Sequence, residues 1–239
     1  MSKSKLFRPS ARPAGYGITI GTPGLYDLLA PLFFFGRRRR AYRELLGAAG
    51  VRRGDRVLDV GCGPGYFVRM LAEAVGQEGS VIGIDAAPEM IEYANRKSGR
   101  IISSCAFQVG TVESLPFPDD SFDVVVSSLM VHHLPEEGRA EAIREMRRVL
   151  RPGGTLLVAD FKIPEHGIWG FLARITRHSG HGSSPTQRAM LARVSPLEPI
   201  MLEAGFRELR TGDARPWLHF VAAEKRVDRS VDAAAAAGD

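Results

Sequence analysis

The sequence predicts a doubly wound α/β fold built on a mostly parallel sheet. Short apolar runs rich in β-branched residues recur between residues 57 and 160, several end in a carboxylate, and helical spacing separates the first two. Buried parallel strands have this near-continuous apolar character, and the helices between them cover both faces of the sheet. A chain of 239 residues with 44% hydrophobic content can bury one such domain with additional segments.

The first apolar run contains Asp59 and ends in three alternate glycines, Gly61, Gly63 and Gly65, after which the spacing becomes helical. Glycines let the backbone approach a ligand closely, and a helix start offers unpaired N–H groups. The spacing is G-x-G-x-G, which differs from the G-x-G-x-x-G of dinucleotide sites, and no Gly-Lys-Ser/Thr follows as in a phosphate-binding Walker loop. This loop is therefore predicted to bind another flat, polar cofactor.

Further strands follow in order along the chain. The second run ends at Asp85, where a carboxylate can accept hydrogen bonds from both hydroxyls of a ribose, and Pro88 suits the first turn of the next helix. The remaining predicted elements are strands over 106–110, 121–128 and 155–159, a helix end at 145–150 with a turn to 154, a helix over 201–206 and an alternating strand over 217–223.

Asp59, Gly61, Gly63 and Gly65 resemble, residue for residue, the D-x-G-x-G-x-G motif of class I S-adenosylmethionine-dependent methyltransferases. The Leu-Arg-Pro-Gly-Gly sequence at 150–154 resembles the small-molecule branch of that superfamily, which includes ubiquinone-biosynthesis and sugar O-methyltransferase-like enzymes. The resemblance covers residues 51–160 and 197–226. It implies a Rossmann-like, seven-stranded, mostly parallel sheet whose last strand is antiparallel.

The resemblance also implies the cofactor, S-adenosylmethionine, with S-adenosylhomocysteine as its product. In this family the residue at Asp85 holds the ribose and an apolar residue such as Met90 packs on the adenine. Thr111 stands where many relatives carry an Asp that accepts from the adenine amino group, and an uncharged hydroxyl accepts more weakly. Cys62 is expected to fill space in the loop rather than act as a nucleophile. The full predicted cofactor set is Asp59, Gly61, Cys62, Gly63, Gly65, Asp85, Ala86, Met90, Thr111, Val112, Glu113 and Ser128.

Two histidines follow the fourth predicted strand, and Asp160 closes the fifth. Both positions lie at the carboxyl edge of the sheet, where open α/β folds bind ligands. A carboxylate that orients an imidazole is the arrangement general-base catalysis needs, and similar O-methyltransferases use a His and an Asp from these positions. We predict His132 as the base, Asp160 as its partner and His133 as the substitute. Alternatively, one histidine packs beside the cofactor or caps the next helix. No metal is expected.

The domain organisation is predicted from where the family motifs lie, in residues 51–160 and 197–226. The resemblance implies that residues 1–50 form a helical N-terminal cap that controls substrate access and that 51–228 form the methyltransferase domain, with a lid insertion at 161–196. Residues 229–239 are predicted to be a disordered tail. Candidate substrate residues in the cap and lid are Tyr26, Phe34, Trp169 and Phe171, although lid packing is an alternative role for the aromatics.

The formal charge of +5 is concentrated in Arg37–Arg40, Arg43 and Arg52–Arg53. A solvated helix face is the expected role of the four-arginine run, with an acidic substrate or an anionic membrane surface as alternatives. Nucleic acid is not expected, since the fourth strand ends in Ser-Ser-Leu-Met rather than in the Asn/Asp-Pro-Pro-aromatic motif of base methyltransferases. Two cysteines form no disulfide framework, and no leader or spanning run is visible, so a cytoplasmic enzyme is expected. The oligomeric state, monomer or homodimer, stays open.

These features together predict transfer of a methyl group from S-adenosylmethionine to an oxygen or carbon of a small molecule, such as a natural product, a sugar or a quinone-like ring. Two alternatives stay open. One is a lipid or quinone C-methyltransferase that works at a membrane surface, and the other is a non-methylating, cofactor-binding or cyclase-like protein.

Overall fold

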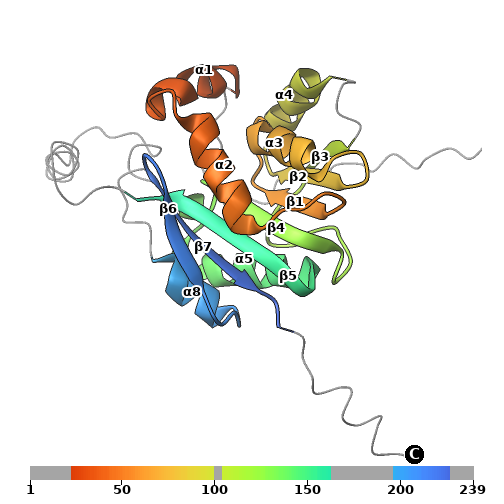
Figure 1. The fold of residues 1–239 in the computed structure, drawn as a ribbon, viewed down its shortest axis with the longest axis vertical. Helices are drawn as coiled ribbons and strands as arrows, with labels where there is room; N and C mark the ends of the chain where they lie inside the picture. The colour runs from red at the N-terminus through yellow and green to blue at the C-terminus, as the bar shows by residue number, and fades with distance from the viewer. Residues whose placement is uncertain (1–22, 100–103, 163–195, 227–239) are drawn as a thin grey trace, which may run out of the picture.

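Seven strands form one sheet at the centre of the protein, in the order β3-β2-β1-β4-β5-β7-β6 (Figure 1). The computed structural model describes residues 23–99, 104–162 and 196–226. Its strands are β1 (Arg56–Val60), β2 (Ser80–Asp85), β3 (Cys105–Val109), β4 (Phe122–Ser128), β5 (Leu150–Phe161), β6 (Arg210–Ala214) and β7 (Leu218–Glu224). Its helices are α1 (Pro23–Phe33), α2 (Arg38–Ala49), α3 (Tyr66–Val75), α4 (Pro88–Ser98), the 3-10 turn η1 (Val131–His133), α5 (Glu136–Val149) and α8 (Leu197–Glu203).

Strand directions agree with the prediction. β1 pairs in parallel with β2 and β4, β2 with β3, and β4 with β5, whereas β7 runs antiparallel to both β5 and β6. The central strands are buried because helices cover both faces, which explains their apolar, β-branched sequences. A mostly parallel, Rossmann-like sheet with an antiparallel last strand is thus confirmed.

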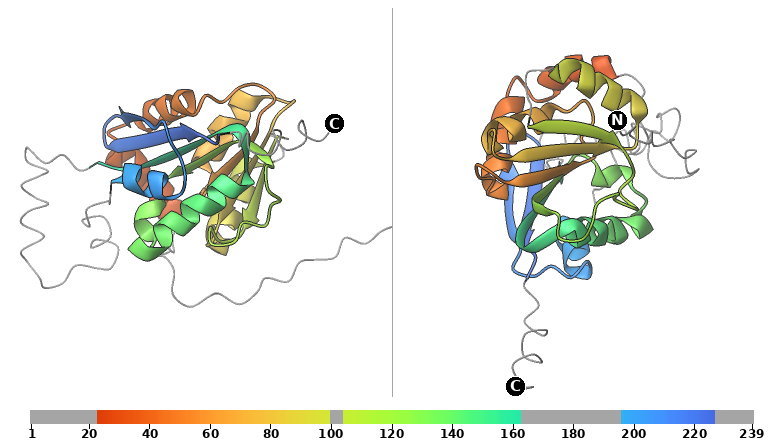
Figure 2. Two further views of the ribbon diagram at one scale, coloured as in Figure 1. Left: turned by 90° about the horizontal axis from the view of Figure 1, so that it is seen from below. Right: turned by 90° about the vertical axis from the view of Figure 1, so that its right-hand side faces the viewer.

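Helices lie on both sides of this sheet (Figures 1 and 2). α2, α3 and α4 pack on one face, and α5 and α8 on the other. Parallel strands place their carboxyl ends at one edge, so the loops that follow β1, β2, β4 and β5 meet there. This edge carries the candidate site.

The start of β5 differs from the prediction. β5 begins at Leu150 rather than after the Pro-Gly-Gly turn, because Leu150 pairs with Phe122 and the register shifts before Val124. Gly153, at φ +74°, donates its N–H to the Lys225 carbonyl at 2.7 Å, and a side chain on Gly154 would collide with backbone oxygens. The Pro-Gly-Gly residues therefore lie within β5, as a bulge-like irregularity in its pairing with β4.

The C-terminal elements differ as well. α8 begins at Leu197, four residues before the predicted start, and the chain leaves the helix through Gly205 at φ +93°. β6 was not located from the sequence, because its five residues, Arg-Thr-Gly-Asp-Ala, lack an apolar alternation.

The four-arginine run is only partly a solvated face. Arg37, Arg39 and Arg40 are exposed, but Arg38 is buried and donates to Asp27 Oδ1 at 2.8 Å. Its guanidinium lies 3.8 Å from the centre of the Tyr66 ring, the first residue of α3. The expectation of a uniformly solvated run is corrected at this residue, where the periodicity of α2 turns the side chain inward.

Among residues 23–99, 104–162 and 196–226, no helix combines the length and apolar character needed to cross a bilayer.

Candidate cofactor and catalytic site

The glycine loop between β1 and α3 has left-handed backbone at all three motif positions, with φ of +76° at Gly61, +51° at Gly63 and +73° at Gly65. These values favour glycine at each position. A side chain on Gly61 would collide with Met130, and one on Gly65 would collide with Phe107, whereas Gly63 has open space on its Cβ side. Two glycines therefore allow close packing within the protein, and Gly63 leaves room for a ligand.

Asp85 ties this loop to the end of β2. Its Oδ2 accepts a hydrogen bond from Gly63 N at 2.8 Å, and its Oδ1 accepts from Ala87 N at 2.9 Å. Burial raises the pKa of Asp85, although these two backbone hydrogen bonds oppose the increase. Each carboxylate oxygen retains a further lone pair, so both can still accept from the two hydroxyls of a ribose.

Asp59 lies in β1 beneath the loop and is 1% exposed. Neither carboxylate oxygen has a hydrogen-bond partner among the described residues. Burial, and secondarily the nearby charge of Asp85, raise the pKa of Asp59 to about 8. Buried polar atoms are almost always satisfied, so a carboxylate without donors is a group that a bound ligand can satisfy.

His132 and Asp160 come together at the carboxyl ends of β4 and β5. His132 Nδ1 lies 2.7 Å from Asp160 Oδ1, and the His132 backbone N–H donates to Asp160 Oδ2 at 2.9 Å. The Phe161 N–H also donates to Asp160 Oδ1, at 2.8 Å, so the carboxylate is fixed in place. With Nδ1–H donating to this carboxylate, Nε2 is the nitrogen left to accept a proton. The structure assembles this pair, and its catalytic role stays a prediction.

A strained residue places η1 against the glycine loop. Leu129 has φ +57°, which is unfavourable for a side chain with a Cβ, and donates its N–H to the Ala159 carbonyl at 2.9 Å. The chain then turns so that Met130 packs against Gly61 and His132 faces Asp160. The roles of Leu129 and Met130 are not predictable from the sequence, because no sequence pattern marks a leucine with left-handed backbone or the residue that follows it.

The second histidine has a different environment. The His133 ring centre lies 4.0 Å from that of His132, and its Nδ1 has no partner among the described residues. Burial, with repulsion from His132, lowers the pKa of His133 to about 4. His133 is therefore uncharged near neutral pH, which suits packing beside a ligand.

The four residues predicted to lie on the adenine side differ in their burial. Met90 in α4 is buried, Thr111 is half-buried after β3, and Glu113 is exposed. Val112 is buried in the hydrophobic core with Ile84, so its side chain contributes to the core. A role of Val112 toward the cofactor would therefore fall to its backbone.

Three further members of the predicted set lie around the loop. Cys62 is buried and its thiol pKa is raised well above the usual value by burial, as expected for a side chain that fills space. Ser128 is half-buried at the end of β4, and Ala86 is exposed directly after Asp85.

The predicted substrate residues are only partly visible. Phe34 is buried and packs against Tyr42, with ring centres 6.1 Å apart. Tyr26 lies in α1, but its side chain is outside the described part of the structure. Trp169, Phe171, nearly all of the predicted lid and the predicted tail are also outside it. In the parts that are described, no three metal-binding side chains gather in a group that could hold an ion.

Comparisons with known proteins bear on this site. Residues 57–154 match a family described as "Methyltransferase domain". Two similar curated proteins are each named "Ubiquinone/menaquinone biosynthesis C-methyltransferase UbiE". The one from Pseudoalteromonas translucida is 34% identical over 145 residues, covering 60% of this chain and 57% of that protein. The one from Proteus mirabilis is 37% identical over 141 residues, covering 58% and 55%. The chain thus matches less than two thirds of the length of these relatives.

Solved structures share the fold. A SAM-dependent methyltransferase from Aquifex aeolicus superimposes with a TM-score of 0.64 at 24% identity, over 84% of this chain and 97% of that one. The [4+2]-cyclase SpnF superimposes with a TM-score of 0.60 at 21% identity, over 88% and 99%. The family match over residues 57–154, the strand order of the sheet and the glycine loop all indicate the same kind of domain. Residues 57–154 therefore carry a methyltransferase domain, in a sheet that shares the fold of a solved SAM-dependent methyltransferase.

Proposed function

We propose that this chain transfers a methyl group from S-adenosylmethionine to a small-molecule acceptor, with a ring carbon as the favoured target and an oxygen as the alternative. The observation that carries the proposal is the His132–Asp160 pair at the carboxyl edge of the sheet, where Met130, two residues before His132, packs against Gly61 of the glycine loop. The preference for carbon and for a quinone-like ring rests on the names of the curated relatives.

The residues at this edge suit the cofactor. Gly63 offers open space, Asp85 offers two acceptor oxygens for the ribose, and Asp59 offers a buried carboxylate without donors among the described residues. When bound, S-adenosylmethionine supplies an electrophilic methyl group on a sulfonium. The protein then has to hold the acceptor in line with that group.

His132 would take the proton that the acceptor loses. Attack of a hydroxyl oxygen or acidic carbon on the methyl group would break the methyl–sulfur bond and leave S-adenosylhomocysteine, while the proton of the acceptor would move to Nε2 of His132. Asp160 then stabilises the resulting imidazolium through the 2.7 Å contact at Nδ1. His133 is the substitute base if the acceptor approaches from that side, but its pKa of about 4 makes it a weak proton acceptor, so His132 is the preferred base.

The proposed partners follow from the same site. The acceptor is a small molecule, and a nucleic-acid substrate is not part of the proposal because β4 ends in Ser-Ser-Leu-Met. A monomer and a homodimer both remain compatible with it.

Cofactor binding is tested by calorimetric titration with S-adenosylhomocysteine. Replacing Asp85 with Asn removes charge-assisted hydrogen bonds, so affinity should fall roughly ten- to hundredfold. Asp55→Asn is the matched control, since Asp55 also accepts a backbone N–H, from Arg52 at 2.7 Å, at the opposite edge of the sheet. A folded parent protein that does not bind S-adenosylhomocysteine would refute the proposal.

Transfer is tested with labelled S-adenosylmethionine and a panel of ring acceptors that lack a methyl group. His132→Ala should lower kcat by about 10²- to 10⁴-fold with little change in the Kd for S-adenosylhomocysteine, and Asp160→Asn should also lower kcat. Unchanged kcat in both variants would exclude the proposed base. Binding of the cofactor without S-adenosylhomocysteine formation for any acceptor would favour a non-methylating role.

A further inference from the structure

Helix α1 exposes apolar side chains to solvent. Leu28 is 70% exposed and Leu32, one turn later, is 72% exposed, so the two lie on the same face. Phe35, which follows the helix, is 57% exposed. The described residues contain five exposed large hydrophobic side chains, and the three most exposed of them lie within this short stretch of the chain.

The other side of α1 is already occupied. Ala30 in the helix and Phe34 just after it are buried, and Asp27 is paired with Arg38 and Lys97. Asp27 is also the one charged residue in the helix sequence. The helix is therefore apolar on its outer as well as its inner side, a pattern typical of helices that are covered on both sides. Its 11 residues span only about 16 Å, too short to cross a bilayer.

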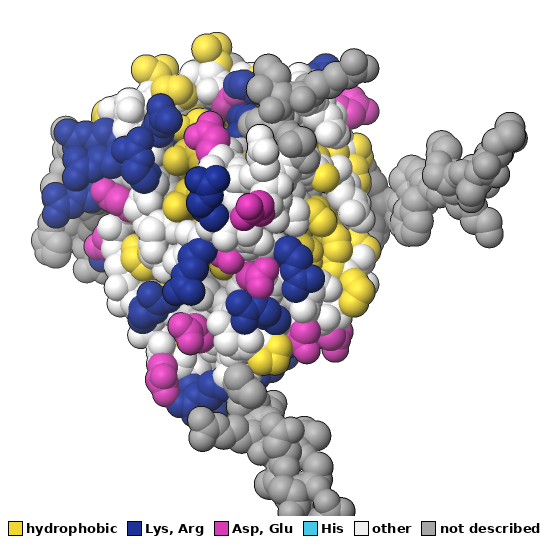
Figure 3. Space-filling model, turned by 45° about the vertical axis from the view of Figure 1, so that its right-hand side comes forward, with side chains coloured by type: hydrophobic (Ala, Val, Ile, Leu, Met, Phe, Trp, Pro, Cys, Tyr) yellow, Lys and Arg dark blue, Asp and Glu magenta, His cyan; other side chains and the backbone are white. Residues whose placement is uncertain are grey.

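Exposed arginines adjoin this apolar face. Arg37, Arg39, Arg40 and Arg43 are all exposed at the start of α2. Glu44 is the single acidic residue between residues 34 and 50, and it pairs with Arg40 at 3.1 Å. In Figure 3, basic side chains gather at the upper left of the molecule, with hydrophobic side chains above them. A net positive cluster next to exposed apolar side chains is complementary to an anionic lipid bilayer, which has negatively charged headgroups outside and apolar acyl chains within.

We propose that Leu28, Leu32, Phe35, Arg37, Arg39 and Arg40 form a docking face for an anionic lipid surface. The three apolar side chains enter the boundary between headgroups and acyl chains, and the guanidinium groups pair with lipid phosphates. The helix lies in the plane of the interface and does not cross it.

The docking face is connected to the candidate site. Arg38, from the same arginine run, stacks on Tyr66 directly after Gly65, and Asp27 on the inner side of α1 pairs with Lys97 of α4. A membrane bound to the outer side of α1 and α2 would therefore lie close to the elements that frame the cofactor loop. The inference goes beyond the proposed function and does not depend on which acceptor is methylated.

The test is sedimentation of the full chain with vesicles of phosphatidylcholine alone or of phosphatidylcholine mixed with phosphatidylglycerol. The parent protein should bind the mixed vesicles, and salt should weaken the binding. Replacing Arg37, Arg39 and Arg40 with Gln should lower the partition coefficient roughly a hundredfold, because each basic residue near an anionic surface contributes about fivefold. Leu28→Ser with Leu32→Ser should lower it about tenfold or more.

Matched controls come from other surfaces of the same chain. Arg52→Gln with Arg53→Gln removes exposed charge in the loop before β1, and Leu202→Ser removes an exposed leucine from α8. Both should bind like the parent. Equal loss in these controls, or no binding of the parent to mixed vesicles, would overturn the proposal. A dimer seen by analytical ultracentrifugation without lipid, and abolished by the Leu28 and Leu32 changes, would assign the face to a second copy instead. Because the assay has no catalytic readout, its failure leaves the proposed methyl transfer standing.

Discussion

Asp59 is the group of the site whose surroundings most disfavour the ionised form. It is fully buried in the central strand β1, its oxygens have no donors among the described residues, and its pKa is raised to about 8, first by burial and then by Asp85. In the absence of ligand, the carboxyl is therefore mainly protonated at neutral pH. A cationic ligand group that approaches it favours the carboxylate, so binding and proton release become linked.

Asp59 should make the ligand-free protein less stable as pH rises. The unfolded chain releases this proton near pH 3.9, whereas the folded protein holds it until about pH 8. Between these values the folded state binds the extra proton, so the free energy of unfolding falls by up to about 1.4 kcal/mol per pH unit. Asp59→Asn removes this slope, and urea unfolding between pH 5 and 8 measures it.

Asp123→Asn is the control for this experiment. Burial alone would raise the pKa of Asp123, but hydrogen bonds from Arg56 N and the Arg151 guanidinium outweigh burial and lower it. Its contribution to stability is lost only in acid, so the Asp123 variant should keep the parental slope above pH 5. If the Asp59 variant and the parent differ by a constant amount at every pH, the raised pKa is wrong.

Single residues differ in how far the sequence predicts them. Asp85 and His132 were identified because each follows an apolar run at a fixed place in a parallel sheet. Arg38 was not distinguished from its neighbours, since its burial depends on Asp27 and Tyr66 from other helices. Met130 is an apolar residue, so the sequence does not indicate its role. Its side chain occupies the space that the missing side chain of Gly61 leaves. Contacts between distant segments are what the sequence alone does not show.

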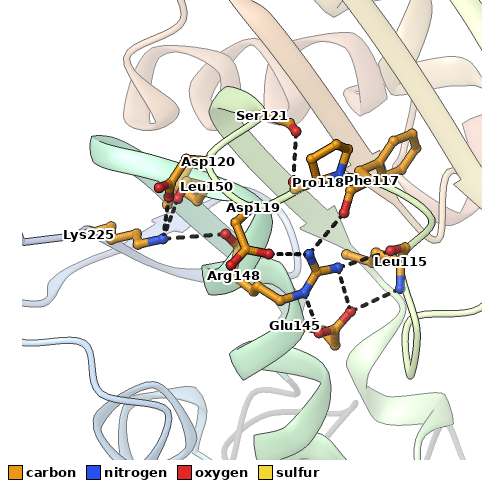
Figure 4. A network of polar contacts seen from close by, with 10 residues as sticks. All are labelled: Leu115, Phe117, Pro118, Asp119, Asp120, Ser121, Glu145, Arg148, Leu150 and Lys225. Carbon is orange, nitrogen blue, oxygen red and sulfur yellow. Dashed lines mark hydrogen bonds and ion pairs between the residues drawn. The ribbon is translucent and has the colours of Figure 1, made fainter.

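At the scale of elements, α5 holds the segment that leads from the predicted adenine side into β4. Arg148 donates to the carbonyls of Leu115 and Phe117 at 3.0 and 2.9 Å, and to the carboxylates of Asp119 and Glu145 (Figure 4). Glu145 in turn accepts from Leu115 N at 3.0 Å. These contacts fix the end of the segment that begins at Thr111, so we expect Arg148 to act as a positioning residue for the cofactor site.

Arg148→Ala should lower the free energy of unfolding by about 1–3 kcal/mol, because several charge-assisted hydrogen bonds are lost together. It should also weaken S-adenosylhomocysteine binding, as measured by calorimetry. Arg144→Ala is the matched control on the same helix, since Arg144 forms exposed pairs with Glu141 and Glu203 and should change stability by less than about 1 kcal/mol. Equal effects of the two changes would mean that the Arg148 contacts do not hold the segment.

Element boundaries were predictable where one pattern dominated. The ends of β1 and β2 and both bounds of β4 agree with the prediction within a residue, because these apolar runs end at glycine or polar residues. The start of β5 depends on pairing with Phe122 and on the Lys225 carbonyl, which are distant in sequence. β6 is held by pairing with β7 and has no apolar pattern of its own. Such strands form because a partner strand is already in place.

At the scale of the whole molecule, α1 and α2 form a cap in which α2 is packed into the core of the sheet domain and α1 is more loosely attached. α1 contacts α4 through Asp27, which binds Lys97, and α2 packs on β5, β6 and β7. Phe35 contacts Trp217 beside the β6–β7 hairpin, with ring centres 5.7 Å apart. The cap thus bridges the two ends of the sheet, and Asp27 is its main polar connection to the cofactor half.

Asp27→Ala should release α1 while the sheet stays folded. The change leaves the buried guanidinium of Arg38 without this carboxylate, and breaking such a pair is strongly destabilising unless the segment opens to water. Hydrogen exchange of the amides in 23–33 should rise about tenfold or more, with strands β1 and β4 unchanged. Glu92→Ala, which removes an exposed pair with Arg96 on α4, should leave α1 exchange as in the parent.

Acid should release α1 in the parent protein, as the Asp27→Ala change does at neutral pH. Burial by itself raises the pKa of Asp27, but hydrogen bonds from Lys97 and Arg38 outweigh burial and lower it. The contribution of Asp27 is therefore complete above the unfolded pKa of about 3.9 and is lost as pH falls through the lower folded value. In a Trp169→Phe background, Trp217 fluorescence reports the Phe35 contact and should change below about pH 4 in the parent. In the Asp27→Ala protein the same change should already be present at neutral pH. A signal that is identical in both proteins at every pH would show that other contacts hold the cap.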